Sequence, residues 1–172
     1  MRLLEAVLDT PIIKRIRRNH ALEHATIHVL SSRRRGLPLA GRSTASGFYI
    51  YGQVSTEEVA NAVGEALARL KAGESDLAIH PNCGTNLVTS VMMSGLAAFT
   101  VMGVNRRGRN ALDRLPTLFL TTAAALIAAQ PLGAAAQAHI TTLADLGDLR
   151  VTGIRLVGRG RLTVHRVDTV SS

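Results

Sequence analysis

The sequence predicts an α+β membrane protein, in which a small α+β domain is interrupted by a transmembrane hairpin of two helices. Two long stretches without a charged residue, joined by a short basic link, predict the hairpin. Segments with helical or strand periodicity lie on both sides of it and predict the domain. We therefore expect an N-terminal α+β region over 1–85, the hairpin over 86–140, and a C-terminal β-hairpin over 141–172 that completes the domain.

The composition is typical of helices packed in a membrane. Of the 172 residues, 47% are hydrophobic but only 3% are aromatic, and there is no Trp. Small apolar residues let helix backbones approach closely in a bilayer. The net charge is +8, and basic clusters at 14–18, 33–35 and 106–109 flank apolar segments without aromatic side chains for base stacking. This pattern favours anionic lipid as the partner, and we expect no nucleic acid.

The first long element is predicted to be a helix that begins at Thr10, an N-cap residue followed by Pro. Its apolar residues recur at helical spacing, and the same face carries His20, Glu23 and His24. Buried ionisable groups are costly unless they are paired or bound to a metal. This face therefore predicts either a metal site or a hydrogen-bonded cluster of His and Glu. His28, one turn further, is expected at the edge of the face rather than as a ligand.

The segment from His20 to His24 has the form H-x-x-E-H, which is the spacing of inverted zinc-hydrolase sites. The two imidazoles are one helical turn apart and can reach one metal ion. A second motif, H-P-N-C-G-T-N, supplies His80 and Cys83 just before the first hydrophobic stretch. We therefore predict zinc as the cofactor, with His20, His24, His80 and Cys83 as candidate ligands. Glu23 is the predicted catalytic base.

Alternatives to these ligands remain open. The second motif could instead be a turn that caps the next helix, with Cys83 as a small buried side chain. Glu58 and Glu65 are rival third ligands, because they lie on a helix predicted to begin at Ser55 with acidic residues in its first turn. That helix is the other candidate wall of the site.

The strands are predicted from alternating patterns. Residues 42–54 alternate and carry aromatic side chains, which predicts one strand. Residues 150–157 and 161–168 also alternate, and the glycine-containing turn between them predicts a β-hairpin. We expect this hairpin to pair with the strand that carries Phe48.

The two stretches predicted to cross the membrane are 87–104 and 116–138, and each is long enough for a bilayer. Gln130-Pro131 in the second stretch predicts a kink or an early helix end. The alternative is a buried helical pair in a soluble protein, because the second stretch is rich in Ala.

The expected location is the cytoplasmic (inner) membrane, with the domain and both termini in the cytoplasm and the link 105–114 outside. The strongly basic N-terminal region, which no signal peptide precedes, favours this orientation. The basic link alone favours the opposite orientation.

The segments RNHALEHATIHVL and AIHPNCGTNLVTS resemble an uncharacterised bacterial membrane family, a domain of unknown function, over residues 18–104. This resemblance implies a membrane location and no established activity. Residues 20–70 also resemble, more weakly, the start of pitrilysin-type inverted zinc peptidases. That resemblance implies zinc bound by His20 and His24 with Glu23 as the base. The third-ligand Glu and the paired half-domains of that family have no counterpart here.

Two classes of function follow. The first is a membrane-bound metal-dependent hydrolase, a zinc peptidase-like protein whose partners are the lipid bilayer and a peptide substrate. The second is a non-catalytic integral membrane protein, whose His/Glu/Cys cluster is structural or holds a metal or haem. Such a protein would act with a membrane protein partner in a larger complex.

Overall fold

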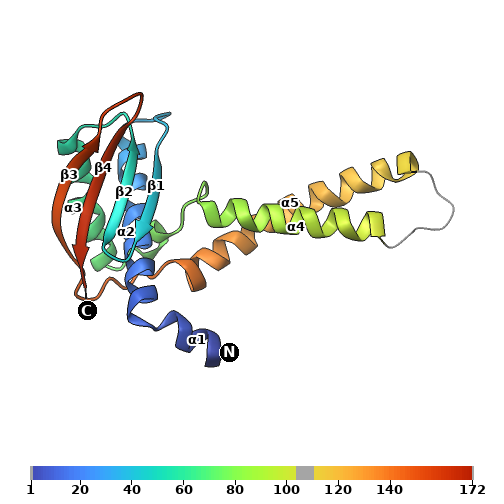
Figure 1. Ribbon diagram of the computed structural model, residues 1–172, viewed down its shortest axis with the longest axis horizontal. Coiled ribbons are helices and arrows are strands. Elements are labelled where there is room, and N and C mark those ends of the chain that lie inside the picture. Colours follow the sequence, from blue (N-terminus) through green and yellow to red (C-terminus); the bar gives the residue numbers. More distant parts are fainter. Residues whose placement is uncertain (1, 104–110, 172) are drawn as a thin grey trace. The chain divides into compact units, whose positions relative to one another are not determined.

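The computed structural model describes residues 2–103 and 111–171 of the chain (Figure 1). The chain divides into two compact units. The first comprises Met1–His80 and Ala138–Ser172, and the second comprises Pro81–Gln137. In the first unit, helices pack against a four-stranded antiparallel sheet. The predicted small α+β domain is therefore confirmed.

The helices of the first unit are α1 (Arg2–Leu8), α2 (Pro11–Arg33) and α3 (Thr56–Lys71). α2 begins at Pro11, as expected, but the hydroxyl of Thr10 does not cap it and donates instead to the carbonyl of Val7 at 2.8 Å. α3 opens with a capping box, in which Ser55 and Glu58 each accept a hydrogen bond from the other's backbone amide. The predicted start of this helix is confirmed.

The sheet contains β1 (Ala40–Thr44), β2 (Gly47–Gly52), β3 (Arg150–Gly158) and β4 (Thr163–Val170), in the order β1-β2-β4-β3. All neighbouring strands are antiparallel. Phe48 on β2 lies opposite Val167 on β4, which confirms that the C-terminal hairpin pairs with the strand carrying Phe48.

The prediction of one strand over 42–54 is wrong, because the chain reverses between Thr44 and Gly47 to form the β1–β2 hairpin. Gly47 has a φ of 134°, which L side chains rarely adopt, and an added Cβ there would overlap the carbonyl oxygen of Val167. The Thr44 hydroxyl donates to the Gly47 carbonyl at 2.9 Å and closes the turn. The alternating pattern of the sequence did not reveal this turn. The polar and small residues before Gly47 continue the same alternation, as they would in one uninterrupted strand.

The core of the first unit lies between the sheet and the helices α2 and α3, which cover one face of it (Figure 1). Burial of apolar side chains from both layers is the main stabilising contribution to such a fold. The largest buried apolar side chains are Leu22, Val29, Phe48, Ile50, Val59, Val63, Leu146, Leu149 and Val167.

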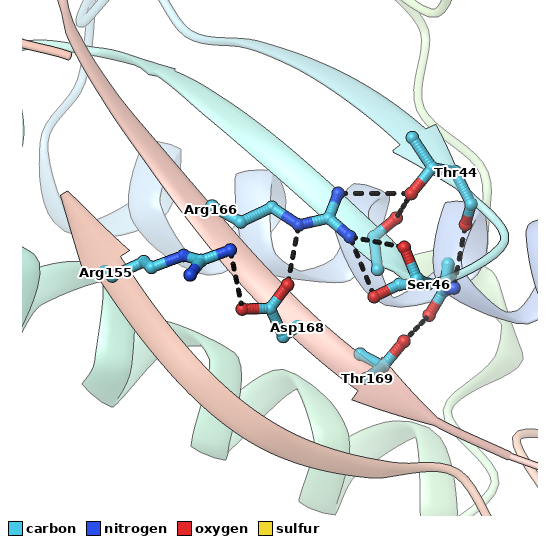
Figure 2. A network of polar contacts seen from close by, with 8 residues as sticks. Thr44, Ser46, Arg155, Arg166, Asp168 and Thr169 are labelled. Carbon is cyan, nitrogen blue, oxygen red and sulfur yellow. Dashed lines mark hydrogen bonds and ion pairs between the residues drawn. The ribbon is translucent and has the colours of Figure 1, made fainter. Parts of the chain in front are cut away.

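A buried arginine joins the sheet to α2 (Figure 2). The Arg166 guanidinium on β4 donates to the Asp168 carboxylate at 2.9 Å and to the Thr44 hydroxyl at 3.1 Å. Asn19 of α2 continues this network, since its amide donates to the Thr44 carbonyl at 2.9 Å and accepts from the Thr169 hydroxyl at 2.7 Å. The network therefore fixes α2 to the sheet at the residue directly before the first motif histidine.

The second unit contains α4 (Gly84–Gly103) and α5 (Leu115–Ala136). A short helix, Gln137–Thr141, continues α5 along the chain into the first unit. Helices over Gly84–Gly103 and Leu112–Thr141 are long and apolar enough to cross a membrane. Of the two alternatives expected at Gln130-Pro131, the early helix end is wrong, because α5 continues through Pro131, while the kink stays a prediction. A proline is tolerated in apolar helices packed against a neighbour. The part of the basic link over 105–110 lies outside the described residues.

The two helices of the second unit share a buried polar contact. The Asn86 side chain accepts a hydrogen bond from the Gln137 amide at 2.8 Å and donates one to the Pro81 carbonyl at 2.8 Å. Gly133 makes room for it, because an added Cβ there would overlap the Asn86 side-chain oxygen. Asn86 therefore joins the first turn of α4 to the end of α5.

Candidate metal centre

Four histidines of the first unit are neighbours. His20, His24 and His28 lie on successive turns of α2, and His80 follows the short helix η1 (Ser75–Ala78). The ring centres are 4.2 Å apart for His20 and His24, 5.7 Å for His24 and His80, and 4.9 Å for His28 and His80. Two imidazoles that share a tetrahedral zinc ion have ring centres about 5 Å apart, given zinc–nitrogen distances near 2.1 Å. The spacing of these rings is therefore compatible with metal binding.

Main-chain carbonyls set the orientation of the two motif histidines. Nδ1 of His24 lies 2.7 Å from the carbonyl oxygen of Ala78, and Nδ1 of His20 lies 2.9 Å from that of Thr141. A carbonyl only accepts, so each Nδ1 carries the proton and each Nε2 carries the lone pair. Histidines that bind metals are commonly held in this way, with the second nitrogen donating to a carbonyl or carboxylate.

His28 holds the chain segment that leads to His80. Its Nε2 donates to the carbonyl of Ile79 at 2.8 Å, next to the Ala78 carbonyl that His24 binds. Two successive carbonyls, those of Ala78 and Ile79, are thus hydrogen-bonded to histidines of α2. These two hydrogen bonds place His80 beside His24 and His28. His28 is half-buried, as expected for the edge of the face.

His80 is electrically neutral at neutral pH. Burial, together with the positive charges that His28 and His24 can carry, lowers its pKa to about 4. A neutral imidazole keeps its lone pair, which is the form that binds a metal ion.

Glu23 is only 4% exposed and packs against strand β1. Its carboxylate accepts a hydrogen bond from the hydroxyl of Ser43, and an added Cβ at Gly41 would overlap one of its oxygens. Burial raises the pKa of Glu23, while the Ser43 hydrogen bond and the charge of His20 oppose that rise. A carboxylate with a raised pKa is suited to accept and return a proton near neutral pH.

Cys83 belongs to the second unit, in the turn before α4. Its sulfur accepts a hydrogen bond from the backbone amide of Thr85 at 3.4 Å. Its placement beside the histidines stays a prediction from the sequence.

The rival acidic ligands are engaged in ion pairs. The Glu65 carboxylate lies 2.5 Å from Arg33 and 3.5 Å from Arg69. Glu58 is used by the capping box of α3 and lies 3.3 Å from Arg34. Both carboxylates are therefore bound to arginines, and neither Glu58 nor Glu65 is a candidate metal ligand.

Sequence reasoning missed the groups that hold the candidate site in place. Ser43 and Gly41 contact Glu23, and the carbonyls of Ala78 and Thr141 orient the histidines. A hydrogen bond to a main-chain carbonyl leaves no sequence signal. The two small residues did leave one, because positions 41 and 43 alternate and so share a face of their strand.

The comparisons place the chain in a family. Residues 15–154 match the family model described as "Domain of unknown function (DUF6391)". A protein of Picosynechococcus sp. (strain ATCC 27264 / PCC 7002 / PR-6), described as uncharacterized, is 40% identical over 144 residues, which cover 76% of this chain and 67% of the relative. No solved structure matches the chain. Since the matched residues include most of both units, the chain belongs to the DUF6391 family.

Proposed function

We propose that this protein is a membrane-bound hydrolase that depends on a transition-metal ion, most simply zinc, held by His20, His24 and His80. One observation carries the proposal: the backbone fixes the Nδ1 protons of His20 and His24 on neighbouring rings. Each ring then offers its Nε2 lone pair, which is the form in which histidine binds a metal ion, and the two ring centres are only 4.2 Å apart. His80, kept neutral by its lowered pKa, adds a third imidazole beside His24.

The residues present fit zinc. Neutral imidazole nitrogens and one nearby carboxylate are donors that zinc commonly takes. Three protein ligands leave one coordination position open, which a catalytic zinc site needs. Cys83, three residues after His80, is the proposed fourth candidate. If its thiolate also binds, the site is closed and structural.

Glu23 is the proposed base. Zinc, when bound, would lower the pKa of a water molecule and polarise a carbonyl group. Glu23 would accept a proton from water and return it to the leaving amine. Ser43 and Gly41 hold its carboxylate on the His20 side of α2, and the hydrogen bond from Ser43 limits the rise of its pKa.

We further propose that α4 and α5 cross the membrane as a hairpin. Large apolar side chains on both helices are exposed, including Phe99 at 75% and Ile127 at 74%, and this argues against a pair buried in a soluble protein. In the sequence, His80 directly precedes the hairpin, and Thr141, which binds His20, follows it within a few residues. Residues of the proposed site are therefore close in the sequence to both ends of the hairpin, and we propose a peptide at the membrane surface as the substrate.

The metal content of the full-length protein purified in detergent tests the proposal. We expect stoichiometric zinc in the wild type, loss of zinc in His24→Ala, and retention in the control His139→Gln, at a histidine with an exposed side chain. Glu23→Gln should keep the metal and lose hydrolysis of a peptide library presented with lipid vesicles. A wild-type protein without metal after growth in added zinc would refute the metal site. Unchanged hydrolysis in Glu23→Gln would refute the assigned base.

The alternative is a non-catalytic membrane protein with a structural His/Glu cluster. The observation that favours it is that Glu23, His20 and His24 already have hydrogen-bond partners within the first unit. It predicts that Glu23→Gln and His24→Ala both lower stability, without any activity or metal to lose. A metal-loaded protein that also requires Cys83, shown by loss of zinc in Cys83→Ser, would support a closed structural metal site.

A further inference from the structure

We propose that α1 and the first turns of α2 form a second membrane contact, which lies in the bilayer interface and binds anionic lipid head groups. The evidence is an exposed group of apolar side chains, which we call the N-terminal apolar patch. It consists of Leu3 at 81%, Leu4 at 52%, Val7 at 46% and Ile12 at 64% exposure. Single exposed apolar residues are common on protein surfaces, but a group of four in adjoining helical turns points to a binding face.

The patch has the pattern of an interfacial helix. On α1, Leu3, Leu4 and Val7 lie on one side at helical spacing, and Glu5 lies on the other. α1 projects from the body of the first unit at the N-terminal end of α2 (Figure 1), and the side chains of Leu3, Leu4 and Val7 are exposed. Helices with one apolar and one polar side lie in the plane of a membrane, with the apolar side among the acyl chains.

Uncompensated positive charge lies directly after the patch. Lys14, Arg15 and Arg17 occupy the first two turns of α2, and no carboxylate in the described parts of the chain forms an ion pair with any of them. The arginines at the other end of α2 differ, because Arg33 and Arg34 pair with acidic residues of α3. A basic cluster without acidic partners, next to an apolar patch, complements a surface of anionic lipid.

Hydrogen bonds connect the first turns of α2 to the residues at the end of the second apolar helix. The Arg17 guanidinium donates to the carbonyls of His139 at 3.0 Å and Thr142 at 3.2 Å, and the Leu143 amide donates to the Arg17 carbonyl at 3.1 Å. The apolar helix over Leu112–Thr141 ends within these same residues. The basic turns of α2 are therefore fastened to the chain where it would leave the bilayer.

Environment-sensitive fluorescence of the full-length protein tests this inference. In a Cys83→Ser background, one Cys is placed at Val7 or, as the matched control, at Glu5 on the opposite side of α1. Each is labelled with a small fluorophore and reconstituted into vesicles of phosphatidylcholine, with or without phosphatidylserine. We expect a blue-shifted emission and several-fold weaker quenching by iodide at Val7 than at Glu5, with a larger difference when phosphatidylserine is present.

The basic residues have their own control. Lys14→Gln with Arg15→Gln should remove the effect of phosphatidylserine at Val7. Removal of two charges from the β3–β4 turn, by Arg159→Gln with Arg161→Gln, should leave that effect in place. Equal quenching at Val7 and Glu5 in both vesicles would overturn the inference. Protection of Val7 that persists in detergent and grows with protein concentration would also overturn it, in favour of a second copy of the chain.

Discussion

The hydroxyl of Ser43 on β1 donates a hydrogen bond to the carboxylate of Glu23 on α2. Two residues earlier on the same strand, Gly41 leaves the space that this carboxylate fills. The acidic residue of the motif is therefore positioned by two small residues of the sheet, while main-chain carbonyls position the motif histidines. The acid and the histidines can accordingly be perturbed separately.

Gly41→Ala should displace Glu23, because the new Cβ would overlap its carboxylate. We expect a loss of about 1–3 kcal/mol in the free energy of unfolding, which is typical of overpacking a buried site. We also expect strongly reduced hydrolysis with the metal retained. Chemical denaturation in detergent and metal analysis measure the two effects.

Gly64→Ala is the matched control for that substitution. Gly64 is an exposed position of α3 where an added Cβ meets nothing within 4 Å. Because Ala is the better helix former, stability should be unchanged or should rise by up to about 1 kcal/mol. In a Glu23→Ala background, Gly41→Ala should cost much less than in the wild type. An equal cost in both backgrounds would show that the carboxylate is not the group that it displaces.

Ser43→Ala should raise the pKa of Glu23, because it removes a hydrogen bond that favours the charged carboxylate. A base works only when deprotonated, so the acidic limb of the pH–rate profile should move to higher pH. The expected loss of stability is about 1–3 kcal/mol, as for a buried polar group left with one partner fewer. Ser32→Ala, which removes a local hydroxyl bond to the Val29 carbonyl on the same helix as Glu23, should leave the profile unchanged.

Local patterns predicted much of the fold. The start of α3 at Ser55, the C-terminal hairpin and its pairing with the strand of Phe48 all follow from residues close in the sequence or from alternation. The turn before Gly47 was missed, because its geometry depends on a φ value and on the carbonyl of Val167, far along the chain. A pattern among residues that are close in the sequence cannot indicate a contact between residues that are far apart in it.

The candidate site was predictable only in part, for a similar reason. Helical spacing puts His20, Glu23 and His24 on one face, and this is a local property. The carbonyl that each ring binds, and the hydrogen bond from Ser43 to Glu23, depend on how α2 packs on the sheet. His28 was expected to be peripheral, yet it anchors the segment that carries His80.

Stability should fall as the pH drops below about 6.5, and His165 is one cause. It is fully buried, with Nε2 3.1 Å from the Thr56 hydroxyl and no hydrogen-bond partner for Nδ1 among the described residues. Burial lowers its pKa in the native state below 6.5. Between pH 6.5 and that lowered value, the unfolded chain binds a proton that the native protein does not, so unfolding becomes more favourable as the pH falls.

His165→Gln should flatten this pH dependence. The slope that it removes cannot exceed about 1.4 kcal/mol per pH unit, the limit for one proton. Unfolding curves at pH 7.5, 6.5 and 5.5 for both proteins measure the difference. His139→Gln, at a residue with an exposed side chain, is the control and should leave the slope unchanged. Identical slopes for the wild type and His165→Gln would show that another group causes the loss.

Thiol labelling in intact cells should place the first unit in the cytoplasm and the link between the two apolar helices outside. The first unit contains the basic turns of α2, and positively charged segments next to membrane helices are retained on the cytoplasmic side. In a Cys83→Ser background, Leu112→Cys, a 75% exposed position between the helices, should react with an impermeant maleimide. Glu57→Cys, an exposed position in the first turn of α3, should react only after lysis. The reverse labelling pattern would show the opposite orientation, which the basic link by itself favours.

Recovery of the protein as a soluble monomer without detergent would refute the membrane hairpin altogether, because its exposed apolar side chains would then have no bilayer to cover them.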